Sequence, residues 1–226
     1  TACRRTKVES PISIAHLKAF AADNVLKNGS VIPQKAEDSG KTVAIVGGGP
    51  AGVEATKWLL QRGHDVTLYE KGEKLGGHVR DAVGAPFKRD LRDYIAYMEA
   101  FGENCGARVF LNTEATPEML NAENYDAVFA AVGADPIFPK VEGIDLPHVH
   151  WAPDAENGKV PCGDNVVIVG GAAVGTESSI TLGMHGKKVT VIEMAKDVAT
   201  KSKLSKTEFL ANISHDIKSP MNTILD

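Results

Sequence analysis

The sequence predicts an α/β protein that contains two similar βαβ units and ends in an amphipathic helix. In residues 43–70 an apolar strand, a glycine-rich turn, a helix and a second strand follow one another, and residues 165–193 repeat that order. In both units an acidic residue follows the second strand, 23 residues after the first glycine of the turn. Near the C-terminus apolar residues recur at spacings of three and four, which is typical of one helix face.

Residues 1–40 are predicted to form a helical segment and a linker. Ser13 is suited to cap a helix whose apolar face would include Ile14 and Leu17. Residues 28–40 are polar and contain an Asn-Gly turn signal, so we expect them to connect this helix to the first βαβ unit.

The turn of the first unit has the sequence G-x-G-x-x-G, formed by Gly47, Gly49 and Gly52. The first glycine permits a tight turn after the apolar strand, the second lets a pyrophosphate approach the backbone, and the third allows close packing of the helix. The helix, which we expect to begin near Ala51, would direct its unpaired N–H groups and its positive dipole end toward phosphates. The arrangement predicts a Rossmann-like dinucleotide-binding unit.

Glu70 is the acidic residue that completes the first unit. It follows the predicted strand 65–69, where its carboxylate can accept hydrogen bonds from a ribose hydroxyl. Glycine turns also occur for structural reasons alone, so the glycine pattern is weak evidence by itself. Here the strand, turn, helix, second strand and acid agree, and this agreement favours the nucleotide site.

Between the two units, the sequence predicts a further glycine turn at Gly76 and Gly77 and an amphipathic helix from Arg89 to Phe101. The apolar stripe of this helix includes Leu91, Ile95 and Met98. A buried strand is expected from Tyr125 to Val132, leading to a turn at Gly133. The Gly76-Gly77 turn, taken alone, would be interpreted as an ordinary loop.

Three local motifs suggest a more specific interpretation: E-K-x-x-x-L-G-G-H, F-K-x-D-L and YDAVFAAVGA. They resemble the C-terminal FAD half of the enoate reductase and 2,4-dienoyl-CoA reductase group, over residues 41–197. The resemblance implies that the first unit binds FAD and that Gly76, Gly77 and Gly133 contact the flavin.

In the second unit Gly170 and Gly175 take the first and third glycine positions, Glu193 takes the acidic position, and Ala172 replaces the middle glycine. The duplication predicts two nucleotides with electron transfer between them, and the resemblance assigns NAD(P)H to this unit. The Ala172 methyl group would crowd a pyrophosphate, so we expect weaker nicotinamide binding or a shifted cofactor. Glu193 favours NADH, since an acid repels a 2′-phosphate, although Lys196 lies close enough to reduce that repulsion.

Cys3 precedes a P-I-S-I sequence. This stretch resembles the end of the iron–sulfur helical domain of the glutamate synthase small subunit and related flavin reductases, which implies that Cys3 is a remaining cluster ligand. A cluster needs about four thiolates, so we expect no cluster and no other metal in this chain by itself. We expect the electrons to pass to a partner domain or subunit that carries an iron–sulfur or flavin centre.

The C-terminal apolar stripe predicts a helix that pairs with a second copy to give a homodimer. It consists of Leu210, Ile213, Ile217, Met221 and Ile224. A histidine on such a helix is most often a surface residue. The surrounding sequence, KTEFLANISHDIKSPMN, resembles the phosphoacceptor H-box of sensor histidine kinases, which implies that His215 is the phosphoacceptor and Asp216 its assisting acid.

Composition narrows the expected partners and compartment. The net charge of −4 and the pI of about 6.0 show no basic surplus, so we expect neither nucleic acid nor an anionic membrane as a partner. The sequence contains no bilayer-spanning apolar run and no secretory signal, which predicts a cytoplasmic protein. Its three cysteines form no C-x-x-C pair, which argues against a disulfide framework and a dithiol redox centre.

Two functions are open at this point. The first is an FAD-dependent NAD(P)H oxidoreductase module that passes a hydride from nicotinamide to FAD and electrons onward; the second is a sensor histidine kinase fragment with a nucleotide-sensing or redox-sensing input region. A third interpretation is an artificial join of unrelated fragments near residues 195–205. Because the sequence begins at Thr1 and offers no closing strand after Glu193, we expect a truncated protein. The expected domains are a helical segment and linker, an incomplete FAD-binding domain, a partial NAD(P)-binding unit and a dimerisation helix, in residues 1–40, 41–160, 161–197 and 198–226.

Overall fold

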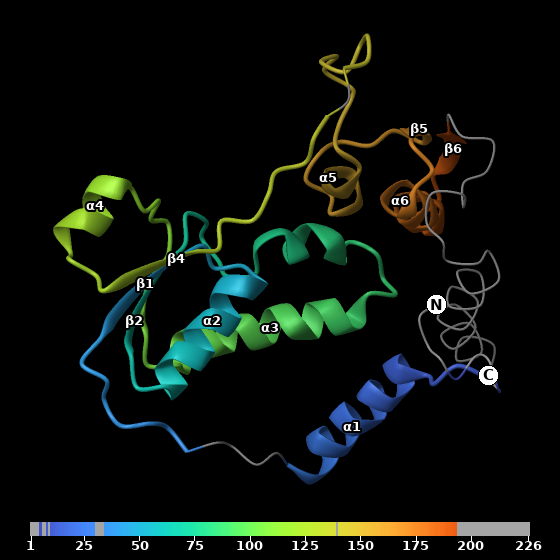
Figure 1. Cartoon of the computed structure of the whole chain (residues 1–226). Coiled ribbons are helices and arrows are strands. Elements are labelled where there is room, and N and C mark those ends of the chain that lie inside the picture. The colour runs from blue at the N-terminus through green and yellow to red at the C-terminus, as the bar shows by residue number, and fades with distance from the viewer. Residues whose placement is uncertain (1–4, 6–7, 9, 30–33, 139, 194–226) are drawn as a thin grey trace. The chain divides into compact units, whose positions relative to one another are not determined.

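The computed structural model of the chain (Figure 1) describes residues 5, 8, 10–29, 34–138 and 140–193. The chain divides into two compact units, residues 1–36 and residues 37–226. Within the described ranges, no helix is both long enough and apolar enough to cross a bilayer.

In the described part of residues 1–36 there is one helix, α1 (Ile14–Asn28). It begins directly after Ser13, but the predicted cap is absent: among the described residues the Ser13 side chain makes no capping hydrogen bond and its hydroxyl pairs with His16 instead. The helix ends before Gly29, whose φ of 81° is a conformation that glycine adopts without steric cost. Ile14 and Leu17 are exposed.

Residues 37–226 contain a four-stranded parallel sheet with the strand order β3-β2-β1-β4. The strands are β1 (Thr42–Val46), β2 (Asp65–Tyr69), β3 (Arg108–Phe110) and β4 (Ala127–Ala130). Three helices connect them in turn, α2 (Pro50–Gln61), α3 (Arg89–Asn104) and α4 (Pro117–Ala122). The apolar strands and the glycine turn therefore form the parallel α/β arrangement that the sequence predicts.

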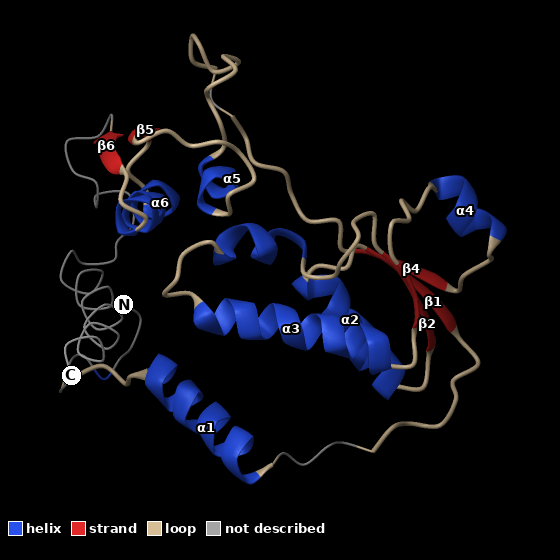
Figure 2. Ribbon diagram, turned by 180° about the vertical axis from the view of Figure 1, so that it is seen from behind, coloured by secondary structure: helices blue, strands red, loops and turns tan. Residues whose placement is uncertain are grey.

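Helices α2 and α3 lie on the same side of this sheet (Figures 1 and 2). The core between them is made of aliphatic side chains and one methionine: Ile45, Val53, Val66, Leu68, Leu75, Ile95 and Met98. Two of these, Ile95 and Met98, belong to the apolar stripe predicted for α3. The burial of the seven core side chains stabilises the packing of β1 against α2 and so fixes the turn between these two elements.

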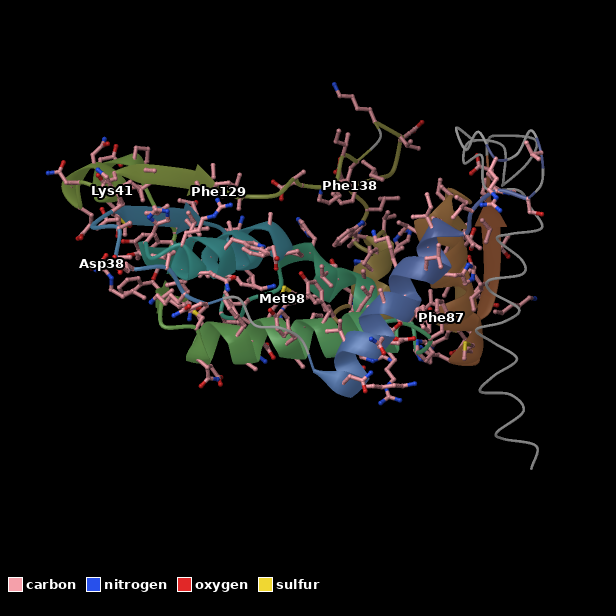
Figure 3. All side chains as sticks on the ribbon, turned by 60° about the horizontal axis from the view of Figure 1, so that its bottom comes forward. Asp38, Lys41, Phe87, Met98, Phe129 and Phe138 are labelled. Atoms are coloured by element: carbon pink, nitrogen blue, oxygen red, sulfur yellow. The ribbon has the colours of Figure 1, made fainter. Side chains whose placement is uncertain are left out.

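β4 is shorter and more exposed than the buried strand predicted for residues 125–132. Val128 and Phe129 are 50% and 46% exposed. β4 is an edge strand, and in the described part of the chain its extensive contacts are with β1 alone. In Figure 3 Met98 lies among the helices, whereas Phe129 lies out on β4. The apolar sequence of β4 shows that the strand favours burial, but the described residues do not cover it.

A smaller βαβ unit follows, in which β5 (Asn165–Val169) pairs in parallel with β6 (Lys188–Ile192) and α6 (Ala173–Met184) connects them. This is the duplication that the sequence predicts. The short helix α5 (Ala152–Glu156) contacts α6 and also η2 (Gly77–Val83), a 3₁₀ helix after β2. Through α5, the second βαβ unit is attached to the segment that follows the first.

An ion pair between Lys41 and Asp126 links the residues directly before β1 and β4. Its acid should make the stability of the fold depend on pH. Asp126 accepts hydrogen bonds from Lys41 Nζ and from the Thr42 N–H, both at 2.8 Å. The bond from Lys41, followed by that from Thr42, lowers the pKa of Asp126 from 3.8 to about 2. A folded-state pKa below the unfolded value stabilises the fold above pH 3.8, and this contribution is lost as the pH falls toward about 2.

We expect the Asp126→Asn variant to lose less stability than the wild type when the pH is lowered through this range. The measurement is urea denaturation at successive pH values. Asp145→Asn is the control, because Asp145 is exposed and makes no ion pair within the described residues; its stability curve should run parallel to that of the wild type. Parallel curves for Asp126→Asn and the wild type would contradict the prediction.

Candidate functional site

The turn between β1 and α2 requires glycine at two positions. Gly47 has a φ of 106°, and a Cβ added there would lie less than 3.0 Å from the carbonyl oxygen of Ala131. A Cβ on Gly52 would lie closer still to the carbonyl oxygen of Gly47. The Gly47 N–H donates to the Tyr69 carbonyl at 2.8 Å. The first turn of α2 is thereby held tightly against the ends of β1 and β2.

The turn between β5 and α6 has the same geometry. Gly170 has a φ of 105°, and its N–H donates to the Ile192 carbonyl at 2.8 Å. A Cβ on Gly175 would lie less than 3.0 Å from the carbonyl oxygen of Gly170. The repeat seen in the sequence is therefore also a repeat of backbone conformation.

The middle position of each turn is different, because its backbone does not require glycine. Gly49 has φ and ψ of −73° and −176°, and Ala172 has −70° and −174°. Both are extended conformations that any residue adopts. Ala172 therefore causes no backbone strain, and any effect of its methyl group must come from contact with a ligand.

The acid after each second strand contacts the glycine turn of its own unit. Glu70 Oε2 accepts from the Gly48 N–H and Oε1 from the Gly72 N–H, both at 2.6 Å. In the second unit Glu193 Oε2 accepts from the Gly171 N–H at 2.7 Å. The carboxylates lie beside the turns, as the spacing predicts. No pattern in the sequence indicates which backbone N–H groups donate to these carboxylates.

The further glycine turns of the first unit lie near the same end of the sheet. The Gly76 N–H donates to the Gly48 carbonyl at 2.9 Å, and a Cβ on Gly77 would lie 3.1 Å from the Gly49 Cα. Gly133 lies three residues beyond β4, and no described atom is within 4 Å of a Cβ added to it. β2 and β4 lie on opposite sides of β1, so these turns meet where the strand order reverses, which is where open parallel sheets bind ligands.

The N-termini of α2 and α6 are suited to anions. Neither helix has a side-chain cap within the described residues, and neither has an acid in its first turn. Their first N–H groups and the positive end of the helix dipole are thus available to a phosphate.

A cavity of about 340 Å³ lies between η2, α5 and α6. Its charged and aromatic lining includes His78, Asp81, Lys88, Trp151, Glu156 and Glu177. Residues 134–136, which directly follow Gly133, form another part of the wall. The cavity therefore borders both βαβ units near their glycine turns.

An ion pair at this cavity joins α6 to Lys88, the residue directly before α3. Lys88 Nζ lies 2.6 Å from Glu177 Oε2, and their side chains are 19% and 31% exposed. Glu177 stands on the first turns of α6, two residues after Gly175. The partial burial makes this pair less screened by solvent than an ordinary surface pair.

A second charged group lies on the η2 side of the cavity. Asp81 Oδ2 accepts from His78 Nδ1 and Asp81 Oδ1 accepts from Lys159 Nζ, both at 2.8 Å. Burial raises the pKa of Asp81, but the hydrogen bonds from Lys159 and His78 outweigh it, so the pKa lies below its ordinary value. The ring of Trp151 stands edge-on to His78, with 6.4 Å between centroids and 85° between planes.

Glu156 also contributes to the cavity wall. Its Oε1 is buried and makes no hydrogen bond within the described part of the chain. Buried polar atoms normally have a partner, so a ligand with a donor group would satisfy this oxygen.

The structure does not describe three of the remaining predicted site residues. His215, Asp216 and Cys3 lie outside the described residues. Cys105 and Cys162 are free thiols, and in the described ranges no group of three or more potential ligands could hold a metal ion. Sequence reasoning missed His78, Asp81, Lys88 and Glu177, although His78 and Lys88 belong to the two motifs L-G-G-H and F-K-x-D-L.

Comparisons with known proteins agree with this geometry. The family model described as "Pyridine nucleotide-disulphide oxidoreductase" matches residues 41–223. NADH oxidase of Thermoanaerobacter brockii is 37% identical over 163 residues, which are 70% of this chain and 25% of that protein. Cinnamate reductase of Clostridium sporogenes is 38% identical over 158 residues, 70% of this chain and 24% of that protein.

Two further matches cover a larger share of this chain. The NAD-dependent dihydropyrimidine dehydrogenase subunit PreT of Escherichia coli is 32% identical over 194 residues, 81% of this chain and 46% of that protein. Among solved structures, a 2-naphthoyl-CoA reductase complex has a TM-score of 0.68 at 34% identity, covering 81% of this chain and 28% of that one. The chain spans about a quarter of the length of the first two relatives and under half of the PreT subunit.

Proposed function

Because this chain belongs to the pyridine nucleotide-disulphide oxidoreductase family, we propose that it is an FAD-dependent NAD(P)H oxidoreductase module. In this proposal a hydride passes from nicotinamide to FAD, and electrons continue to a partner centre. The observation that carries the proposal is the repeated glycine turn, since Gly47 and Gly52 in one unit and Gly170 and Gly175 in the other have the same backbone geometry. Two such turns in one compact unit imply two nucleotides.

The first unit is the proposed FAD site. Gly47, Gly49 and Gly52 would hold the pyrophosphate at the N-terminus of α2, and Glu70 would accept from the ribose. Gly76, Gly77 and Gly133 would border the flavin. The fit is supported by the close approach of two glycine turns, since a Cβ added to Gly77 would lie 3.1 Å from the Gly49 Cα.

The second unit is the proposed NAD(P)H site, formed by Gly170, Ala172, Gly175 and Glu193. We favour NADH, because the Glu193 carboxylate, oriented by the Gly171 N–H at 2.7 Å, would accept from a free 2′-hydroxyl and repel a 2′-phosphate. Lys196, which could reduce this repulsion, lies outside the described residues.

The cavity between η2, α5 and α6 is the proposed place for the reacting groups, because its walls adjoin Gly77, Gly133 and Gly175. When bound, FAD supplies the capacity to accept a hydride, which no side chain offers. The chain contributes positioning, exclusion of water and charge. Lys88 and Glu177 would keep α6 against the segment after η2, so that the two nucleotides stay aligned.

The electron acceptor is proposed to be a partner domain or subunit with an iron–sulfur or flavin centre. One relative is itself named as a subunit of a dehydrogenase, and the other two are about four times longer than the segment they share with this chain. Homodimerisation through residues 198–226 is also a proposal, since that segment lies outside the described residues.

The signalling alternative receives no support from these comparisons. The family match runs to residue 223 and so includes His215 and Asp216. The relatives and the structure reported above are named as an oxidase, reductases and a dehydrogenase subunit.

The visible absorption spectrum of the full chain tests the proposal. After incubation with FAD and removal of the excess, we expect flavin bands that bleach when NADH is added without oxygen. The same titration with NADPH should need a higher concentration. Absence of flavin after incubation with FAD would contradict the FAD site, and bands that persist with both nicotinamides would contradict hydride transfer through the second unit.

A further inference from the structure

His78 is a cavity residue to which the proposed function assigns no role. Its Nδ1 is 2.8 Å from Asp81 Oδ2, and its ring stands edge-on to Trp151. No other hydrogen bond of the ring is found within the described residues. The imidazole is therefore held at one nitrogen and open at the other, on the wall of a cavity of about 340 Å³.

Asp81 is fixed by contacts at three atoms. Besides His78 at Oδ2, it receives Lys159 Nζ at Oδ1, at 2.8 Å, and its main-chain carbonyl accepts from Asn157 Nδ2 at 2.8 Å. Asn157 also donates to the Pro153 carbonyl at 2.7 Å. The segment that follows α5 thus holds Asp81, through Asn157 at its main-chain carbonyl and through Lys159 at its carboxylate.

These contacts determine which nitrogen of His78 carries hydrogen. An ionised carboxylate can only accept hydrogen bonds, and the pKa of Asp81 lies below its ordinary value. Asp81 therefore selects the tautomer with hydrogen on Nδ1, which leaves Nε2 as an acceptor. When Nε2 gains a proton, the bond to Asp81 is retained and the ring need not turn.

We propose that His78 is the proton acceptor of the cavity, and that Asp81 and Lys159 are the residues that position it. This inference rests on the proposed function. A hydride consists of two electrons and one proton, so when both electrons leave singly to a one-electron acceptor, one proton remains. The bond that would hold this hydrogen on the reduced cofactor breaks once its two electrons have left, and the released proton forms an N–H bond with His78 Nε2, which converts the neutral ring to the cation.

The other charged groups around His78 come from every element that borders the cavity. Asp135 follows β4, Glu156 belongs to α5, and the Lys88–Glu177 pair joins α6. Among the residues that the structure describes, Asp81 alone is hydrogen-bonded to the imidazole. Lys159 is shared between Asp81, at 2.8 Å, and Asp154, at 3.3 Å, so it supports the carboxylate from the solvent side.

Nitrogen NMR of the full chain without nicotinamide tests the tautomer. We expect neutral His78 to carry hydrogen on Nδ1 in the wild type and to shift toward the Nε2–H form in Asp81→Asn, whose amide can donate to Nδ1. A wild-type ring with hydrogen on Nε2 would overturn the proposal, because that nitrogen could not accept a proton.

The second test separates hydride arrival from electron departure. The flavin-loaded chain is reduced with NADH without oxygen and then reoxidised with ferricyanide, which accepts only electrons, across a range of pH. We expect His78→Gln to lower the ratio of reoxidation to reduction rates at least about tenfold and to remove the pH dependence that the wild-type ratio shows.

His148→Gln is the control, because His148 is an exposed histidine outside the cavity; its ratio and pH profile should match the wild type. If His78→Gln is still bleached by NADH and keeps the wild-type ratio of reoxidation to reduction rates and its pH profile, the inference about His78 is overturned but the proposed function is not. Failure of NADH to bleach the wild-type flavin would overturn the proposed function and this inference with it.

Discussion

The Gly52→Ala variant is expected to raise the dissociation constant for FAD by about a hundredfold. The new Cβ would lie less than 3.0 Å from the Gly47 carbonyl oxygen, which is backbone and cannot rotate away. The N-terminus of α2 must therefore move off the turn, and the N–H groups that would face the pyrophosphate move with it. Overpacking of this kind costs about 3 kcal/mol, which corresponds to about two factors of ten in affinity. Titration of the full chain with FAD, followed by flavin fluorescence, measures the effect.

Two matched variants make this test specific. Gly175→Ala creates the same conflict with the Gly170 carbonyl in the second unit, so it should retain FAD but lose bleaching by NADH. Gly183→Ala introduces a methyl group in α6 where no described atom lies within 4 Å, and both nucleotides should still bind. FAD binding by Gly52→Ala within about threefold of the wild type, with circular dichroism unchanged, would contradict the proposed role of this turn.

Much of the fold follows from local sequence. Strands β1 and β2 begin and end within one residue of the predicted bounds, because each is an apolar run bounded by a glycine or an acid. The stripe containing Ile95 and Met98 was sufficient to predict the buried side of α3. β4 was harder: its apolar residues predicted burial, but cover depends on what packs against an edge strand, and Val128 remains half exposed.

The candidate site was predictable where one segment determines the geometry. The positive φ of Gly47 and the close approach of Gly52 to its carbonyl follow from spacing within one turn. Contacts between residues far apart in the sequence could not be predicted in this way. Asp81 and Lys159, for example, are 78 residues apart. Their contact depends on how α5 lies against η2, which no local pattern encodes. The extended backbone at Ala172 could not be predicted either, because the glycine motif does not indicate at which of its positions the backbone requires glycine.

Lys88→Met is expected to lower the free energy of unfolding by about 2 kcal/mol. Its Nζ lies 2.6 Å from Glu177 Oε2, and both side chains are more than two-thirds buried. Without the ammonium group, the carboxylate stays partly desolvated without its compensating charge, and this loss is costlier than the net value of the pair. Urea denaturation of the full chain, followed by circular dichroism, measures the change.

The comparison with Lys57→Met shows whether burial is the cause. Lys57 lies 3.3 Å from Glu54 Oε1, but these side chains are 40% and 48% exposed, so the exchange should cost about 0.5 kcal/mol or less. Adding Glu177→Gln to Lys88→Met removes the uncompensated charge and should restore part of the lost stability. Equal losses in the two lysine variants, or no recovery in the double variant, would show that the Lys88–Glu177 pair does not hold α6 in place. The alignment of the two proposed nucleotide sites would then have to depend on α5 and its contacts with η2.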